Sequence, residues 1–205
     1  MPRLGPAVRT GIVALIGAAV VVAAGTWFWH LTDARRSRDR PATGGPGVQL
    51  ATPFIWPGRV RPAVVPARAA TLADEEMVIG VVANGKARAY RVRAFSRMFD
   101  YVVNDVVGDT PITVTHCDRT GCTRVFTGDG SEPLPIKMGG YVDGLILLVN
   151  GTFYYHEDGR PADPRGPPFP YRQADFEQAT WMAWRTAHPD TDVYEGERPI
   201  KQPTP

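Results

Sequence analysis

Short apolar runs separated by turn-forming residues make up most of the chain after Thr71. Three pairs of such runs flank a tight connection: 77–83 with 86–90, 112–117 with 122–126, and 144–149 with 152–156. Two of the connections are Asn-Gly, which is typical of two-residue turns because both central residues adopt positive φ. The pattern therefore predicts three β-hairpins. The run 145–149 does not alternate between apolar and polar residues, which indicates a central strand covered on both faces.

Two further segments have apolar residues at helical spacing. The first predicts a helix of about ten residues from side chains three or four positions apart, Val92, Phe95, Met98, Phe99 and Val102. The second begins with Asp175 as its N-cap and ends at His188-Pro189, and its Trp181 and Trp184 are expected to fill the core. Hairpins and helices together predict an α+β fold, in which one small domain has a mixed or antiparallel sheet with two packed helices.

An uncharged apolar segment of 19 residues, Gly11–Trp29, precedes these elements. Its length is close to the roughly 20 residues that span a bilayer, and Trp27 and Trp29 lie at one end, as interfacial anchors do. We therefore expect an N-terminal transmembrane helix that anchors the protein in the membrane. A cleaved signal peptide is the alternative, because a short basic stretch precedes the apolar run and small residues lie within it.

The composition divides the chain into five parts. These are a short N-terminus (1–10), the transmembrane or signal segment (11–29), a tether rich in proline and arginine (30–70), a globular α+β domain (71–198) and a frayed tail (199–205). Phe54, Ile55 and Trp56 interrupt the tether. They fit either a short edge segment of the domain or an isolated apolar patch.

Basic residues are concentrated in the N-terminal part of the chain. Residues 1–70 contain nine Lys or Arg and two Asp or Glu, whereas residues 71–205 contain 14 and 19. A mildly acidic domain without a basic stripe argues against nucleic-acid binding. The arginines after the apolar segment favour a cytoplasmic domain, whereas the signal-like layout and the cysteine pair favour the opposite side. We expect a single-pass protein of the cytoplasmic membrane with an extracytoplasmic domain, or a secreted protein if the segment is cleaved.

The second hairpin, within 111–126, contains both cysteines of the chain, Cys117 and Cys122. With a four-residue loop between them the cysteines oppose each other, and a small local adjustment would allow a disulfide. Strand alternation places Arg124 on their face of the hairpin and His116 on the other face. Because a nearby guanidinium favours a thiolate, Cys117, Cys122 and Arg124 are the candidate catalytic residues.

Three roles of this hairpin remain open from the residues alone: a structural disulfide, a reversible dithiol or reactive thiol, and a metal or haem site. The metal role would join His116 or His156 to Cys117 and Cys122, but a structural zinc usually has four ligands and the sequence shows no such set. No cofactor is identified. The sequence also has no nucleotide-binding, serine-hydrolase or metalloprotease motif, so it does not decide whether the protein is an enzyme.

Several short motifs follow one another in a recognisable order: 78–82, Ala89-Tyr90, 103–105, 111–117, 124–126, Thr180-Trp181 with Trp184, 188–191 and Val193. Over residues 74–194 this order resembles the bacterial domain of unknown function 3179 (DUF3179). The resemblance implies a secreted or membrane-anchored protein and carries no activity. Many members have a Cys-Pro-Leu-Cys-Gly segment, whereas here Thr120 stands at the second cysteine position and Cys122 lies two residues later. The resemblance therefore does not imply a C-x-x-C redox or metal role for this chain.

These observations lead to two hypotheses about function. The first is a membrane-tethered extracytoplasmic protein in which Cys117 and Cys122 have a thiol-disulfide or metal-linked role. The second is a non-enzymatic binding or assembly module of the cell envelope, in which a disulfide only braces the turn. The membrane would be contacted through residues 11–29, and the protein or small-molecule partner is not identified by the sequence.

Overall fold

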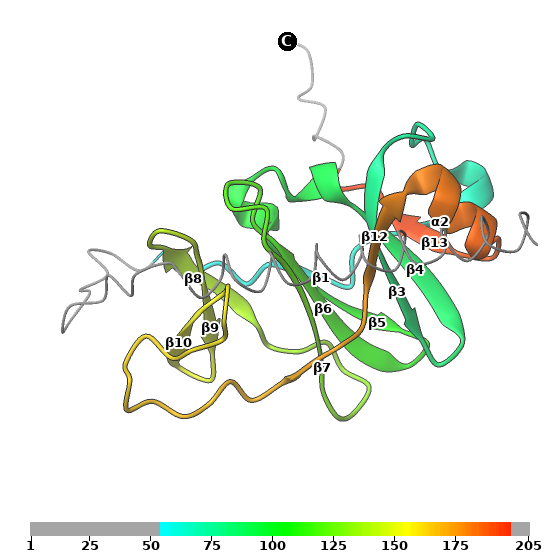
Figure 1. Cartoon of the computed structure of the whole chain (residues 1–205). Coiled ribbons are helices and arrows are strands. Elements are labelled where there is room, and N and C mark those ends of the chain that lie inside the picture. The colour runs from blue at the N-terminus through cyan, green and yellow to red at the C-terminus, as the bar shows by residue number, and fades with distance from the viewer. Residues whose placement is uncertain (1–53, 198–205) are drawn as a thin grey trace, which may run out of the picture. The chain divides into compact units, whose positions relative to one another are not determined.

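A computed structural model describes residues 54–197 of the chain. This part consists of three β-sheets and one α-helix arranged in layers (Figure 1). A five-stranded sheet lies in the middle, and its two faces pack against a three-stranded sheet and a second five-stranded sheet. The helix covers the outer face of the second five-stranded sheet.

The central sheet has the strand order β1-β5-β6-β7-β11. Its strands are β1 (Arg59–Val60), β5 (Val102–Val107), β6 (Thr110–His116), β7 (Thr123–Thr127) and β11 (Arg172–Gln173). Nearly every residue of β6 is buried, because alternate side chains face the two neighbouring sheets. Its β-branched residues suit this position, since they pack well on both faces of a pleated strand.

The second five-stranded sheet has the order β12-β3-β4-β13-β2. Its strands are β2 (Val65–Pro66), β3 (Met77–Ala83), β4 (Lys86–Arg91), β12 (Glu177–Thr180) and β13 (Asp192–Tyr194), and the short 3-10 helix η1 (Ala67–Ala69) follows β2. The first expected hairpin is β3–β4, and its turn residues Asn84 and Gly85 have φ of 47° and 72°. These angles are the reason for the Asn-Gly pair.

The helix α2 (Trp181–Ala187) closes the outer layer. Trp181 and Trp184 are buried as expected, packed in one cluster with Val78 of β3 and Val193 of β13. The indole Nε1–H of Trp184 also donates to the hydroxyl of Thr191 at 3.0 Å. This hydrogen bond satisfies the polar edge of a side chain that is otherwise surrounded by apolar groups.

The three-stranded sheet has the order β10-β9-β8. It consists of β8 (Lys137–Tyr141), β9 (Leu145–Val149) and β10 (Thr152–Tyr155). The third expected hairpin is β9–β10, with Asn150 and Gly151 in the turn at φ of 49° and 81°. The non-alternating run forms β9, which is the middle strand of this sheet as predicted.

The prediction of a helix between Val92 and Val102 is wrong. Two 3-10 helices, η2 (Val92–Phe95) and η3 (Met98–Asp100), occupy the segment, and Val102 already begins β5. The apolar spacing arises for another reason: Phe95 and Val102 are buried in different core clusters, while Met98 and Phe99 are exposed. These side chains therefore do not share one apolar face.

The second expected helix exists but is shorter than predicted. Glu177–Thr180 pairs with β3 as the edge strand β12, and the helix begins only at Trp181. Its N-cap is Thr180, whose hydroxyl accepts the Ala183 N–H at 3.3 Å, rather than Asp175. The expected α+β class with two packed helices is thus wrong, because the described residues are mainly β-sheet with α2 as their one α-helix.

The β-sheets include residues from the segment that the composition predicted to be a tether. Within the expected tether, β1 pairs in parallel with β5, and β2 pairs antiparallel with β13. The expected transmembrane segment, 11–29, lies outside the described residues. From Phe54 to Glu197, no helix combines the length and the apolar character that crossing a bilayer requires.

A buried ion cluster joins the central sheet to the second five-stranded sheet. Arg88 of β4 donates to both carboxylate oxygens of Asp192 on β13, at 2.7 and 2.9 Å, and to Asp105 of β5 at 2.8 Å. The hydroxyl of Tyr90 also donates to Asp105, at 2.9 Å. Because the Asp105 and Arg88 side chains are almost fully buried, each charge depends on the others for the interactions that water would otherwise supply.

Replacing Asp105 with Asn tests this cluster. The amide has the size of the carboxylate but no charge, so Arg88 and Tyr90 lose their strongest shared acceptor. We expect the free energy of unfolding, measured by urea denaturation, to fall by about 2–4 kcal/mol. Asp158→Asn is the matched control, because Asp158 forms an exposed pair with Arg160, and it should change stability little. If the two substitutions lowered the free energy of unfolding equally, the proposed contribution of the cluster to stability would be contradicted.

Candidate functional site

The cysteine hairpin has the register that the sequence predicted. His116 pairs with Thr123 and Thr115 with Arg124, so Cys117 and Cys122 are the next opposed positions. The Cys117 N–H donates to the Cys122 carbonyl at 3.0 Å, and the Gly121 N–H donates to the Cys117 carbonyl at 2.8 Å. The four residues between the cysteines therefore form the connecting loop.

The expected disulfide is not present, because Cys117 and Cys122 are both free thiols. Their backbone hydrogen bond identifies them as the hydrogen-bonded kind of antiparallel pair. In such a pair the Cα atoms lie about 5.5 Å apart, against about 4.5 Å in the other kind, so the side chains approach each other less closely. The loop is instead closed by backbone hydrogen bonds.

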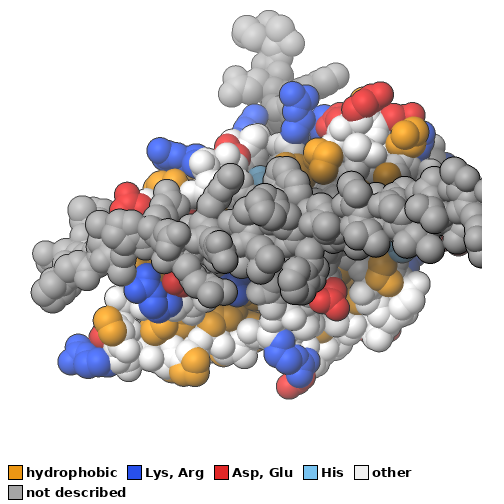
Figure 2. Space-filling model, viewed as in Figure 1, with side chains coloured by type: hydrophobic (Ala, Val, Ile, Leu, Met, Phe, Trp, Pro, Cys, Tyr) orange, Lys and Arg blue, Asp and Glu red, His pale blue; other side chains and the backbone are white. Residues whose placement is uncertain are grey.

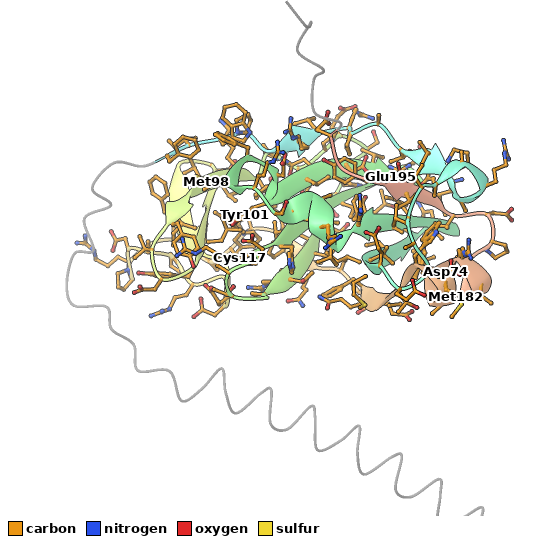
Figure 3. The ribbon with its side chains drawn as sticks, turned by 90° about the horizontal axis from the view of Figure 1, so that it is seen from above. Asp74, Met98, Tyr101, Cys117, Met182 and Glu195 are labelled. Carbon is orange, nitrogen blue, oxygen red and sulfur yellow. The ribbon has the colours of Figure 1, made fainter. Side chains whose placement is uncertain are left out.

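The surroundings of the two thiols are different. Cys117 is fully buried in the core cluster between the central and the three-stranded sheets. Tyr101 lies beside it (Figure 3) and donates its hydroxyl proton to Asp118, the first residue of the loop. Cys122 is only partly exposed, and burial together with the negative charge of Glu157 raises the pKa of its thiol to about 11.

Arg124 lies where alternation placed it but does not activate the cysteines. Its guanidinium lowers the pKa of Cys122, which is opposed by burial and by Glu157. The same guanidinium donates to the His156 carbonyl and to the side chain of Gln173, each at 3.1 Å. Arg124 thus ties β7 to the segment after β10 and to β11. The expected catalytic trio shares a face of the hairpin, but the raised pKa of Cys122 keeps that thiol protonated at neutral pH.

The two candidate histidines are in different places. His116 lies on the opposite face, as predicted, with Nδ1 2.7 Å from the Thr123 hydroxyl and its ring against Phe95. His156 is fully buried with Nε2 2.8 Å from the Thr115 hydroxyl. Among the described residues, no group of three or more His, Cys, Asp or Glu side chains could hold a metal ion. The structure therefore does not bring His116, His156 and the cysteines together as ligands.

The hydrogen bonds of His156 define its protonation. The Thr115 hydroxyl donates its one proton to the Arg124 carbonyl at 2.9 Å, so the Thr115 oxygen accepts from His156 Nε2–H. Nδ1 is then unprotonated, and it has no hydrogen-bond partner. Burial, with the positive charge of Arg124, lowers the pKa of His156 to about 3. A neutral, enclosed imidazole of this kind braces the strands and does not exchange protons near pH 7.

The pH dependence of alkylation by iodoacetamide tests the state of the cysteine hairpin. In a Cys117→Ala variant, which isolates Cys122, the rate should rise with pH and be half-maximal near pH 11. At pH 7.5 it should be about 10- to 100-fold below that of an ordinary cysteine, because the thiolate fraction is small. Glu157→Gln should accelerate the reaction, since it removes a charge that raises the Cys122 pKa. A half-maximal rate at or below pH 7.5 would show an activated thiol.

The sequence analysis missed an arginine-lined cleft, which has a volume of about 500 Å³. It is built from η2 and η3, from β1, and from the residues that follow β13. The charged side chains that line it are Arg59, Arg91, Arg93, Arg97, Asp100, Glu195 and Glu197. Gly196 permits this packing, because its φ is 100° and a Cβ there would lie 3.1 Å from that of Ala94.

Two of the arginines are held in place by carboxylates. Arg59 donates to Asp100 at 2.6 Å, and Arg91 donates to Glu76 through two nitrogens, at 2.5 and 2.8 Å. By contrast, the Arg93 and Arg97 side chains are exposed and make no hydrogen bond or ion pair with a described residue, although the charge of Arg93 helps to lower the pKa of Glu76. The cleft therefore has two fixed guanidinium groups beside two that are available to a ligand.

The signal for this cleft in the sequence is weak. Arg93 and Arg97 are four residues apart and would share one face of the expected helix, but a pair of surface arginines is not by itself a sign of a cleft. Arg59 comes from the expected tether and Glu195 from the far end of the domain. Their meeting depends on the pairing of β1 with β5 and of β13 with β4, which are long-range contacts that local patterns do not reveal.

Comparison with known proteins places the chain in a family without assigning an activity. No curated protein and no solved structure matches the chain. The matched segment of the family, residues 53–156, includes the cysteine hairpin and all four arginines of the cleft, but not Glu195 or Glu197. Because that segment covers half of the chain, the chain belongs to the family described as "Protein of unknown function (DUF3179)".

Proposed function

We propose that this protein is a membrane-tethered binding module of the bacterial cell envelope whose arginine cleft takes an anionic ligand. The observation that carries the proposal is the pair Arg93 and Arg97, which line a cleft and have no partner among the described residues. Guanidinium groups recognise phosphate and carboxylate oxygens through paired N–H donors. A small phosphate- or carboxylate-bearing ligand is the class that fits these donors.

The fixed charges around the cleft support binding of an anion. Asp100 is already engaged by Arg59, and Glu195 accepts from the N–H and the hydroxyl of Thr71. Asp100 and Glu195 therefore have hydrogen-bond partners, whereas the Arg93 and Arg97 side chains make no hydrogen bond with a described residue. Arg59 is paired with Asp100 and Arg91 with Glu76, so the remaining charged residues of the lining are Arg93 and Arg97 beside Glu195 and Glu197.

The thiol-disulfide role is the weaker candidate for this protein. A thiol with a pKa of about 11 is almost entirely protonated at neutral pH, and the other cysteine is enclosed in the core. Redox and nucleophilic roles require the thiolate, which is favoured in partly exposed, electropositive surroundings. The burial of the hairpin fits a structural element that positions β6 and β7.

The proposed location rests on the sequence of the N-terminal part. The uncharged segment 11–29 is long enough to span a bilayer, and its layout resembles that of an exported protein. We expect a reporter fused after Pro205 to be active only when it requires export, for example as alkaline phosphatase. A fusion that is active only as a cytoplasmic reporter would contradict the extracytoplasmic placement.

Titration with inorganic phosphate tests the cleft directly. The full chain should bind phosphate saturably with a dissociation constant on the order of 1 mM, which corresponds to about 4 kcal/mol. Replacing Arg93 and Arg97 together with Gln should weaken binding at least about tenfold, because each charged hydrogen bond contributes roughly 1.5–3 kcal/mol. Calorimetry or chemical-shift titration provides the measurement.

Arg68→Gln is the matched control for that experiment. Arg68 is also exposed and also has no partner among the described residues, but it lies outside the cleft. It should leave phosphate binding unchanged. Phosphate binding that is absent from the wild type, or that weakens equally in the control, would overturn the proposed function.

A further inference from the structure

An exposed apolar patch lies next to the arginine cleft. Four large apolar side chains, which we call the docking patch, are 40–47% exposed: Phe54, Ile55, Met98 and Phe99. The Phe99 ring meets Phe54 at a centroid distance of 5.5 Å and Trp56 at 4.9 Å. These ring contacts bring together two apolar segments that are far apart in the sequence. Large apolar side chains gathered in this way indicate an interaction surface.

The protein fixes this surface without covering it. Trp56 pairs with Met138 by two backbone hydrogen bonds, at 2.9 and 2.8 Å, so the segment with Phe54 and Ile55 is attached to the edge of β8. On the other side, Asp100 is buried and tied to Arg59, which holds the end of η3. The patch is thus supported by a rigid frame and does not depend on a loop closing over it.

Two arginines of the cleft lie close to the patch in the sequence. Arg97 directly precedes Met98, and Arg93 lies on the same cleft wall, where neither has a partner among the described residues. An apolar surface with adjacent arginines matches a bilayer interface, where acyl chains lie below a layer of phosphates. On the parts of this face that grey atoms leave visible, Figure 2 shows acidic and basic side chains intermixed. This arrangement suits a local contact with phosphates rather than a long polyanion.

The patch also lies where the described chain begins. Phe54 is the first described residue, and 24 residues separate it from the apolar segment that ends at Trp29. Even fully extended, 24 residues reach no farther than about 80 Å. If 11–29 spans the membrane, the linker limits the distance between the described domain and the bilayer to about 80 Å, so a weak affinity for lipid is sufficient because the contact is intramolecular.

We propose that the docking patch and the cleft together form a membrane-docking face for anionic phospholipid. Phe54, Ile55, Met98 and Phe99 enter the acyl boundary, while Arg93 and Arg97 bind the headgroup phosphates of the same leaflet. This inference rests on the proposed function, since it names a lipid phosphate as the anion of the arginine cleft. It adds an orientation, in which the domain lies on the membrane through the face where its N-terminal segment enters.

Hydrogen exchange of the full chain in nanodiscs tests this docking. One nanodisc contains phosphatidylcholine alone, and the other contains phosphatidylcholine with phosphatidylglycerol. Peptides that cover 54–56 and 93–99 should exchange more slowly in the anionic nanodiscs. Peptides from α2 should exchange equally in both, because Met98 and Met182 lie at opposite ends of the domain (Figure 3).

Two matched pairs of substitutions separate the contributions. Met98→Glu should abolish the protection, whereas Met182→Glu should not, although Met182 is 52% exposed and of the same residue type. Arg97→Gln should abolish the difference between anionic and neutral lipid, whereas Arg68→Gln should retain it. Both test positions are exposed, so the variants are expected to fold, and far-UV circular dichroism verifies this.

The outcomes distinguish the docking face from the proposed function. Inorganic phosphate that binds the cleft, with no lipid-dependent protection at 54–56 or 93–99, leaves the anion-binding function and overturns the docking face. Protection that survives both Met98→Glu and Arg97→Gln also overturns it. A chain that remains outside nanodiscs of both compositions contradicts the tether and the docking together. Protection lost in Met98→Glu and Arg97→Gln, and retained in the two controls, supports the proposal.

Discussion

The buried guanidinium of Arg88 is the contact on which the arrangement of the layers depends. It binds Asp105 of the central sheet and Asp192 of the neighbouring sheet, so it fixes β5 and β13 relative to β4. A buried charge leaves little freedom in the position of its partners, because separation would expose an unpaired charge to an apolar interior. Three strands distant in sequence are thereby held in one register across two sheets.

The arginine cleft follows from that register. Beyond its end at Arg91, β4 leads into η2 with Arg93. β13, which runs parallel to β4, leads into Glu195, and β5 begins just after Asp100. The residues of the cleft therefore gather at one end of the strands that Arg88 connects. The cysteine hairpin is part of the central sheet. Its strands β6 and β7 separate two core clusters, and Cys117 is buried in one of them.

Local chemistry was sufficient to predict the hairpins of this protein and insufficient to predict its packing. Asn84-Gly85 and Asn150-Gly151 form the predicted turns, and alternation placed Cys117 and His116 on opposite faces of β6. The helix predicted from Val92 to Val102 failed because similar spacing also arises when consecutive turns send side chains to separate clusters. The opposed cysteines were predicted correctly, but both are free thiols and backbone hydrogen bonds close the loop. The cleft required β1 and β13 to pair with distant strands, which no local pattern encodes.

We propose that a ligand binds at Arg93 and Arg97 and not at the cysteines. One titration of the full chain with inorganic phosphate, followed by NMR of the arginine Nε–Hε groups and the cysteine Cβ carbons, observes both places at once. The account predicts saturable shifts of the Arg93 and Arg97 signals while the Cys117 and Cys122 signals remain still. Shifts at the cysteines with unchanged arginine signals would contradict it.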